Sequence, residues 1–155
     1  MAPSECEIIY HSRDILRRLT TSAAPLSKLP SQLYYNRGCL EEGLRGVAAG
    51  GAKKAVVVTD VGIASTPILQ RVLSCLRGEG VEVEVFHDVH PDPDMECIKN
   101  GVEFCNTVKP DTIIALGGGS PIDAAKFIRV QYEHPEMSLE GDRLIGCLAV
   151  KSKML

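Results

Sequence analysis

Residues 113–123 have the sequence I-I-A-L-G-G-G-S-P-I-D, and this stretch decides both the expected fold and the expected ligand site. The apolar run at 113–116 contains two β-branched isoleucines and is typical of a buried strand. Three glycines follow at 117–119. Because glycine has no Cβ, the backbone can turn sharply there and bring its N–H groups close to a ligand. The stretch therefore predicts a strand that ends in a tight glycine turn.

The residues after the glycines predict a helix that runs to about Tyr132. Ser120 is a good N-cap residue, Pro121 suits the first helical position, and Asp123 completes a Ser-x-x-acid capping box. A strand, a glycine turn and a helix N-terminus together build an anion site, because free N–H groups and the positive end of the helix dipole point outward. We therefore expect a phosphate or pyrophosphate ligand. The expected buried face of the helix consists of Pro121, Ala124, Ala125, Ile128 and Tyr132.

This motif differs from the usual dinucleotide fingerprint. The pattern G-x-G-x-x-G would require a glycine at position 122, where the chain has Ile122. The fingerprint also normally follows the first strand of a unit, whereas three strand-like segments precede the motif here. A second interpretation therefore stays open, in which the glycines serve only as a tight connection between a strand and a helix.

Strand-like and helix-like segments alternate along the chain upstream of this motif. Strands that alternate with helices of about ten to fifteen residues imply a parallel sheet covered on both faces. We therefore predict an α/β fold. The expected strands are residues 32–35, 54–59, 81–86 and 113–116, with a further candidate at 144–150, and the expected helices before the motif are residues 40–48, 68–76 and 95–108.

Composition excludes several classes of function. The 155 residues fit one ordinary domain, and the formal net charge of −3 with scattered Lys and Arg gives no electrostatic footprint for nucleic acid. No apolar run approaches the length needed to span a membrane, and no signal-peptide pattern is present. The six cysteines include no C-x-x-C pair, which indicates reduced thiols. We expect a soluble cytoplasmic protein that binds neither nucleic acid nor membranes.

Residues 1–29 differ in composition from the rest of the chain. Roughly helical apolar spacing followed by a small, polar, proline-containing stretch predicts a short helix and a linker. The alternative is a transit peptide for a mitochondrion or plastid, which basic residues favour and acidic residues oppose. The basic residues include Arg13, Arg17 and Arg18, and the acidic ones are Glu5, Glu7 and Asp14.

Ligands in an open parallel sheet gather at the carboxyl ends of the strands. Three such ends carry suggestive residues here: Asp60, the loop around Asp92, and the glycine motif. An acid opposite a pyrophosphate site can accept hydrogen bonds from a ribose diol, and its charge would repel a 2′-phosphate, which favours NAD over NADP. An ordinary helix N-cap or loop acid is the alternative interpretation of Asp60.

The loop at residues 87–94, H-D-V-H-P-D-P-D, contains residue types that can bind metals. Its prolines hold neighbouring side chains apart, so we predict a polar loop and no metal site. Asp92 remains of interest because the loop lies beside the expected cofactor cleft.

Six segments carry a family resemblance: L-P-S-Q-L-Y-Y-N-R-G (29–38), A-V-V-V-T-D (55–60), E-V-E-V-F (82–86), D-P-D (92–94), K-P-D-T-I-I-A-L-G-G-G-S-P-I-D-A-A-K (109–126) and Y-E-H-P-E (132–136). Together they resemble the iron-containing (group III) alcohol dehydrogenases. The last segment is similar to the alcohol dehydrogenase half of bifunctional aldehyde-alcohol dehydrogenases. Related dehydroquinate-synthase-like and glycerol dehydrogenases share the glycine turn, so the resemblance specifies the fold more closely than the substrate.

The resemblance implies a Rossmann-like, NAD-binding α/β domain at residues 30–150, with helices on both faces of its parallel sheet. In the family a helical domain follows, which holds Fe²⁺ or Zn²⁺ through one Asp and three His; the metal polarises the oxygen of a primary alcohol or aldehyde while hydride moves to or from NAD(H). Complete members are expected to form homo-oligomers or filaments. By the same resemblance, Asp60 takes the adenine ribose, Asp92 lies near the cofactor, and the pyrophosphate contacts Gly118, Gly119, Ser120, Pro121, Ile122 and Asp123.

Two departures from the family pattern shape the functional expectation. Where the family has a Thr-Thr-x-Gly-Thr loop after the last strand, residues 149–155 are A-V-K-S-K-M-L, so we expect 151–155 to be a truncated tail. We also expect this chain to lack the helical metal domain. We therefore expect the cofactor domain of an NAD-dependent alcohol dehydrogenase that is inactive alone. The alternatives are a non-catalytic nucleotide-binding or assembly module and a fragment of a glycerol dehydrogenase-like enzyme.

Overall fold

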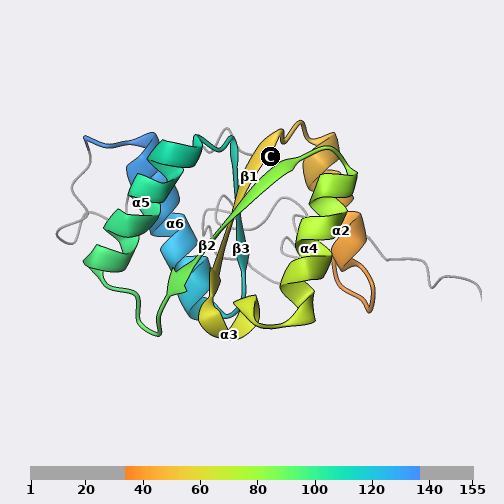
Figure 1. The fold of residues 1–155 in the computed structure, drawn as a ribbon, viewed down its shortest axis with the longest axis horizontal. Coiled ribbons are helices and arrows are strands. Elements are labelled where there is room, and N and C mark those ends of the chain that lie inside the picture. Colours follow the sequence, from red (N-terminus) through yellow and green to blue (C-terminus); the bar gives the residue numbers. More distant parts are fainter. Residues whose placement is uncertain (1–33, 137–155) are drawn as a thin grey trace, which may run out of the picture.

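The computed structural model describes residues 34–136, which form a three-stranded parallel sheet with helices on both faces (Figure 1). The strand order is β2-β1-β3, with β1 (Lys54–Asp60) between β2 (Glu82–Val89) and β3 (Thr112–Leu116). The predicted α/β fold with a parallel sheet is therefore confirmed.

The segments expected at the two ends of the chain lie outside the described residues. These are residues 1–29, the candidate strand at 144–150 and the tail at 151–155. The strand expected at residues 32–35 is described only in part, and Tyr34 forms an isolated β bridge there.

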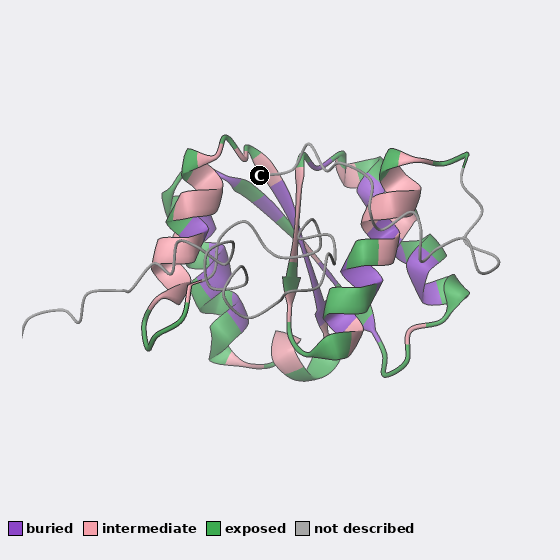
Figure 2. Ribbon diagram, turned by 180° about the vertical axis from the view of Figure 1, so that it is seen from behind, coloured by how far each residue is buried: buried purple, intermediate pink, exposed green. Residues whose placement is uncertain are grey.

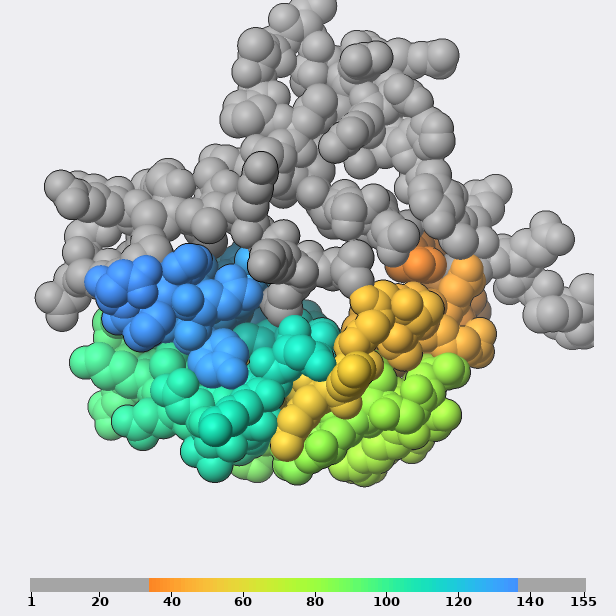
Figure 3. Space-filling view, turned by 90° about the horizontal axis from the view of Figure 1, so that it is seen from above, coloured from red at the N-terminus to blue at the C-terminus, as the bar shows by residue number. Residues whose placement is uncertain are grey.

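Four long helices form two layers around the sheet. Helices α2 (Leu40–Ala49) and α4 (Pro67–Gly78) cover one face, and α5 (Met95–Val108) and α6 (Gly119–Glu133) cover the other (Figure 1). Figure 3 shows the same division from above, with the blue and teal segments on one side and the orange and lime segments on the other. All four were predicted to within a few residues.

A short helix, α3 (Val61–Ala64), follows β1 directly and was not predicted. It has four residues, which is too short for an apolar repeat to show in the sequence.

The central strand β1 is buried on both faces. Its residues 55–59 are fully buried, and all but Thr59 are apolar, as expected for a parallel strand between two helical layers. Val57 pairs with Val85 of β2 and with Ile114 of β3. Because successive side chains alternate between faces, Val56 and Val58 pack toward α5 and α6, whereas Ala55 and Val57 pack toward α2 and α4. Figure 2 shows buried residues, in purple, on the strands and on the helices that flank them.

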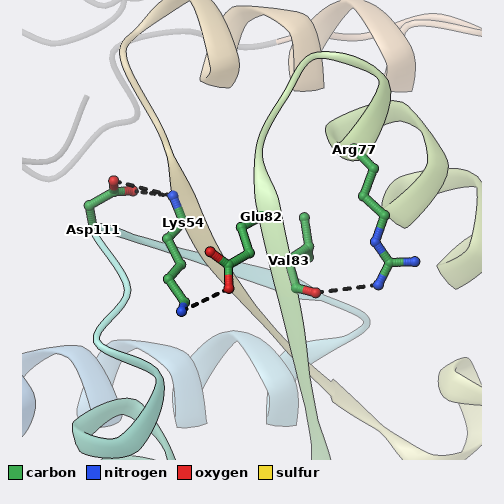
Figure 4. Close-up of polar contacts among 5 residues, drawn as sticks. All are labelled: Lys54, Arg77, Glu82, Val83 and Asp111. Atoms are coloured by element: carbon green, nitrogen blue, oxygen red, sulfur yellow. Dashed lines mark hydrogen bonds and ion pairs between the residues drawn. The ribbon is translucent and has the colours of Figure 1, made fainter.

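A carboxylate fixes the end of the sheet where the strands begin (Figure 4). The Asp111 carboxylate accepts hydrogen bonds from the backbone N–H groups of Lys53 and Lys54, at 3.0–3.3 Å. The Nζ atom of Lys54 lies 2.9 Å from Oε1 of Glu82, and the Arg77 guanidinium donates to the Val83 carbonyl at 3.4 Å. These contacts set the starts of β1, β2 and β3 relative to one another.

Strand β2 is longer than the sequence predicted. We expected it to end at residue 86, with a loop beginning at 87, but it continues to Val89. The register with β1 shifts between Val58 and Asp60, so the simple alternation of buried and exposed positions breaks near the end of the strand. The prediction of a loop at residues 87–89 was therefore wrong, and the true loop begins at His90.

Candidate functional site

A pocket of about 590 Å³ lies at the carboxyl ends of the strands, where a parallel sheet is expected to bind its ligand. Its walls are residues 60–62 at the end of β1, residues 88–91 at the end of β2, and residues 118–121 at the start of α6. Three sequence segments that are far apart therefore contribute to one concave surface.

The glycine turn brings the chain tightly between β3 and α6. Gly117 has φ +147°, a backbone conformation that residues with a side chain rarely adopt. A Cβ added there would lie 2.8 Å from Cγ of Pro121 and 3.2 Å from Oδ2 of Asp60. Only glycine fits at this position. In contrast, a Cβ added to Gly118 or Gly119 would meet nothing within 4 Å. The first glycine is required by the fold, and the next two leave open space at the pocket.

Helix α6 begins at Gly119, two residues earlier than the sequence indicated. Gly118 is the N-cap residue in an extended conformation, with no side-chain hydrogen bond to cap the helix. The predicted capping box is therefore wrong: Ser120 lies inside the first turn, and Asp123 instead pairs with Nζ of Lys126 at 2.9 Å. The N–H groups of Gly119 and Ser120 belong to the first turn and have no partner within the helix.

Asp60 caps a helix, which is one of the two roles considered from the sequence, and it also lines the pocket. Its Oδ1 accepts a hydrogen bond from the backbone N–H of Ile63 at 2.9 Å, so the carboxylate caps α3. The same side chain lines the pocket, and its Oδ2 faces the Gly117 turn. Beside it, the Thr59 hydroxyl donates to the Leu116 carbonyl at 2.7 Å and ties the end of β1 to the end of β3.

The structure gathers only part of the predicted site around the pocket. Asp60, Gly118, Gly119, Ser120 and Pro121 line it. Asp92 lies one residue beyond the lining stretch of its loop, with φ +51°. Ile122 and Asp123 are on the exposed side of α6 and are not among the lining residues.

His90 lines the pocket, whereas the sequence analysis considered it only as part of a loop with metal-binding residue types. Its Nδ1 lies 3.1 Å from the Pro91 carbonyl oxygen, and its Nε2 lies 3.5 Å from Oδ1 of Asp94. Asp94 in turn caps α5 by accepting from the Cys97 N–H at 2.8 Å. The contact with the Pro91 carbonyl raises the pKa of His90, aided by the nearby Asp94 and Glu96 carboxylates and opposed by desolvation.

His87 and His90 do not converge on a common point. Nδ1 of His87 contacts Oδ1 of Asp88 at 2.8 Å, whereas His90 faces Asp94. Among residues 34–136, no group of three or more His, Cys, Asp or Glu side chains is placed to hold a metal ion. Within that same range, no helix combines the length and apolar character required to cross a membrane.

The sequence model of the family described as "Iron-containing alcohol dehydrogenase" matches residues 30–151. The bifunctional aldehyde-alcohol dehydrogenase of Escherichia coli K12 is 46% identical over 113 residues, which are 73% of this chain and 13% of that protein. An NADPH-dependent butanol dehydrogenase of Clostridium saccharobutylicum is 41% identical over 115 residues, which are 72% of this chain and 28% of that protein.

Among solved structures, 1,3-propanediol oxidoreductase superposes with a TM-score of 0.61 at 30% sequence identity. The superposition covers 64% of this chain and 26% of that one. The chain therefore spans well under a third of the length of each of these similar proteins.

Proposed function

The chain belongs to the iron-containing alcohol dehydrogenase family, and we propose that residues 30–150 are the cofactor-binding domain of an NAD-dependent alcohol dehydrogenase. The proposed reaction is the interconversion of a primary alcohol and an aldehyde by hydride transfer. The observation that carries the proposal is the pocket at the strand ends, where Gly118 and Gly119 leave open space beside the first turn of α6.

The start of α6 supports a pyrophosphate at this place. The N–H groups of Gly119 and Ser120 are free of intrahelical partners, and the positive end of a 15-residue helix faces the same space. Both features attract an anion. A side chain at position 118 or 119 would occupy the space that the phosphate needs, so the two glycines keep the site open.

Asp60 supports a preference for NAD over NADP. Its Oδ1 is engaged with the Ile63 N–H, and Oδ2 is oriented toward the glycine turn, where a ribose hydroxyl beside the pyrophosphate would donate to it. A 2′-phosphate would instead meet a carboxylate. Repulsion and the loss of a ribose hydrogen bond together cost on the order of 2–4 kcal/mol. The similar butanol dehydrogenase is named for NADPH, so this preference has to be tested on this chain.

The metal implied by the family name does not fit the described residues. Residues 34–136 contain no group of side chains that could hold Fe²⁺ or Zn²⁺, so no step of the chemistry is assigned to a metal here. When bound, the nicotinamide ring supplies the acceptor or donor of hydride. The described residues bind the phosphates, orient the ribose and position the dinucleotide at the strand ends. The same observation favours the second candidate, a nucleotide-binding module without catalysis of its own.

Titration of the ¹⁵N-labelled chain with NAD⁺ tests the proposal by NMR. We expect shifts concentrated on the amides of Gly118, Gly119 and Ser120, with dissociation constants nearer millimolar than micromolar, roughly −4 to −6 kcal/mol. Gly119→Val should fold normally, because its Cβ meets nothing within 4 Å, and should abolish binding.

Gly78→Val is the matched control. Gly78 ends α4, and a Cβ there also meets nothing within 4 Å, but Gly78 is not among the residues lining the pocket. This variant should therefore bind NAD⁺ like the unsubstituted chain. Unchanged affinity in a folded Gly119→Val protein would overturn the assignment of the site.

A further inference from the structure

The pocket is poor in positive charge for a site that receives a phosphate. Its lining residues include two carboxylates, Asp60 and Asp88, and no lysine or arginine. His90 is the one lining side chain that can carry a positive charge. Near neutral pH, protonation of this single imidazole therefore changes the net charge of the pocket lining more than protonation of any other lining residue.

The geometry around His90 favours the charged ring. A neutral imidazole has one N–H donor and one acceptor nitrogen, whereas both ring nitrogens of His90 face oxygen atoms. Nδ1 faces the Pro91 carbonyl at 3.1 Å, and Nε2 faces Oδ1 of Asp94 at 3.5 Å. Only the doubly protonated ring can donate to both oxygens. The raised pKa of His90 agrees with this arrangement.

In the order of the strands, Asp60 lies between His90 and the proposed pyrophosphate site at residues 118–120. Strand β1 lies between β2 and β3, so Asp60 at the end of β1 separates the His90 loop from the glycine turn. With the pyrophosphate on residues 118–120 and the ribose beside Asp60, a further group on that ribose would lie in the pocket that His90 also lines. His90 and Asp60 are then both walls of the space that such a group would occupy.

We propose that His90 determines cofactor discrimination: its protonated ring is the counter-charge for a phosphate on the adenine ribose, against the repulsion by Asp60. The preference for a dinucleotide without that phosphate then weakens as the pH falls. This inference rests on the proposed function of the pocket, and it adds a residue and a pH dependence to it.

Several other charged groups surround His90, but the carboxylates among them keep their charge in the pH range of the experiment. Carboxylates stay ionised above about pH 5. His87 is a second histidine near the pocket, and its partner Asp88 lines the pocket, so it needs its own control. The titratable groups around His90 are Asp94, Glu96 and Cys97 from α5, His87 and Asp88 from β2, and Asp60 from the end of β1.

The test is the ratio of the NADP⁺ and NAD⁺ dissociation constants, measured by NMR titration at about pH 6.5 and about pH 8.5. His90 changes charge in this interval, while a ribose phosphate remains mostly dianionic. Two charges about 4–6 Å apart near a protein surface interact strongly enough to change an affinity by about 5- to 10-fold. We expect NADP⁺ to gain that factor relative to NAD⁺ at the lower pH. The gain should disappear in His90→Gln and persist in His87→Gln.

Linkage supplies a second readout that does not depend on affinity. If NADP⁺ binds the protonated ring better, then bound NADP⁺ must lower the acid dissociation constant of His90 by the same factor, which raises its pKa, and bound NAD⁺ must raise that pKa less. The imidazole resonances of His90 report this directly. An affinity ratio with the same pH dependence in His90→Gln would overturn the role of His90 while leaving the NAD⁺ site intact. Absence of any binding by NAD⁺ and NADP⁺ would overturn both proposals.

Discussion

Replacing Gly101 with alanine tests how closely α5 and α6 approach each other. Gly101 is buried on α5, and a Cβ there would lie 2.3 Å from Cδ1 and 2.7 Å from Cγ1 of Ile128 on α6. Cε1 of Phe86 would lie 3.3 Å from the same Cβ. Ile128 is fully buried, and a β-branched residue in a helix has one strongly preferred χ1 rotamer. The ring of Phe86 and the rotamer of Ile128 therefore leave the new methyl group little room.

The expected destabilisation follows from two opposing terms. Overpacking of a core costs about 1–3 kcal/mol, and contacts below 3 Å with a constrained side chain place this case at the upper end. Alanine in a helix interior is favoured over glycine by about 1 kcal/mol. We expect Gly101→Ala to lower the free energy of unfolding by about 2 kcal/mol, measured by urea denaturation followed by circular dichroism.

Two variants make the result specific to this contact. Gly78→Ala adds the same methyl group at the end of α4, where nothing lies within 4 Å, and should leave stability unchanged or raise it. Ile128→Val removes the atom at 2.3 Å, and alone it should cost about 0.5–1.5 kcal/mol. In the Gly101→Ala background the same change should cost less. A Gly101→Ala protein as stable as the unsubstituted chain would refute the close approach of the two helices.

Three further outcomes follow from the described contacts. Asp111→Ala removes the acceptor of the Lys53 and Lys54 N–H groups and should cost about 1 kcal/mol of unfolding free energy, whereas Asp111→Asn, which keeps one acceptor oxygen, should cost less. Asp60→Ala removes the cap of α3 and should lower the free energy of unfolding by about 1 kcal/mol. It should also narrow the difference in affinity between NAD⁺ and NADP⁺, mainly by weakening the binding of NAD⁺. Equal affinities for the two cofactors in the unsubstituted chain would contradict this role of Asp60. The 155-residue chain, assayed alone with ethanol, NAD⁺ and added iron or zinc, should form no NADH, as measured by absorbance. The reason is that its described residues include no group of side chains placed to hold a metal ion. Metal-dependent turnover that is lost in a His87→Ala, His90→Ala double variant would show that the loop binds metal.

Elements whose ends carry their own local chemistry could be predicted from the sequence. Helix α5 matched at both ends, because Asp94 caps its first turn, and Lys109 in the left-handed region ends it before Pro110. Strand β1 was equally clear, because an apolar run between Lys54 and Asp60 has no plausible place except between two layers. In these cases the signal lies within the element itself.

Features that depend on tertiary contacts could not be predicted in the same way. Ser120 is as good an N-cap residue as any, but the turn at Gly117, with φ +147°, leads into a helix that already begins at Gly119. The end of β2 was missed because its pairing with β1 shifts register. His90 enters the pocket only because that strand runs on to Val89. For Asp60 both interpretations use the same carboxylate, so no sequence pattern could separate them.

The three consecutive glycines divide between two physical requirements, and substitution can separate them. Gly117→Ala places a Cβ against Pro121 at 2.8 Å on a backbone with φ +147°, so it should lower stability and distort the pocket together. Gly119→Val leaves the fold intact, because its Cβ lies in open space, and should remove only nucleotide binding. A turn that served merely to connect a strand to a helix would need its first glycine and could replace the third without consequence. Loss of binding without loss of stability at position 119 is therefore the result that distinguishes a ligand site from a connection.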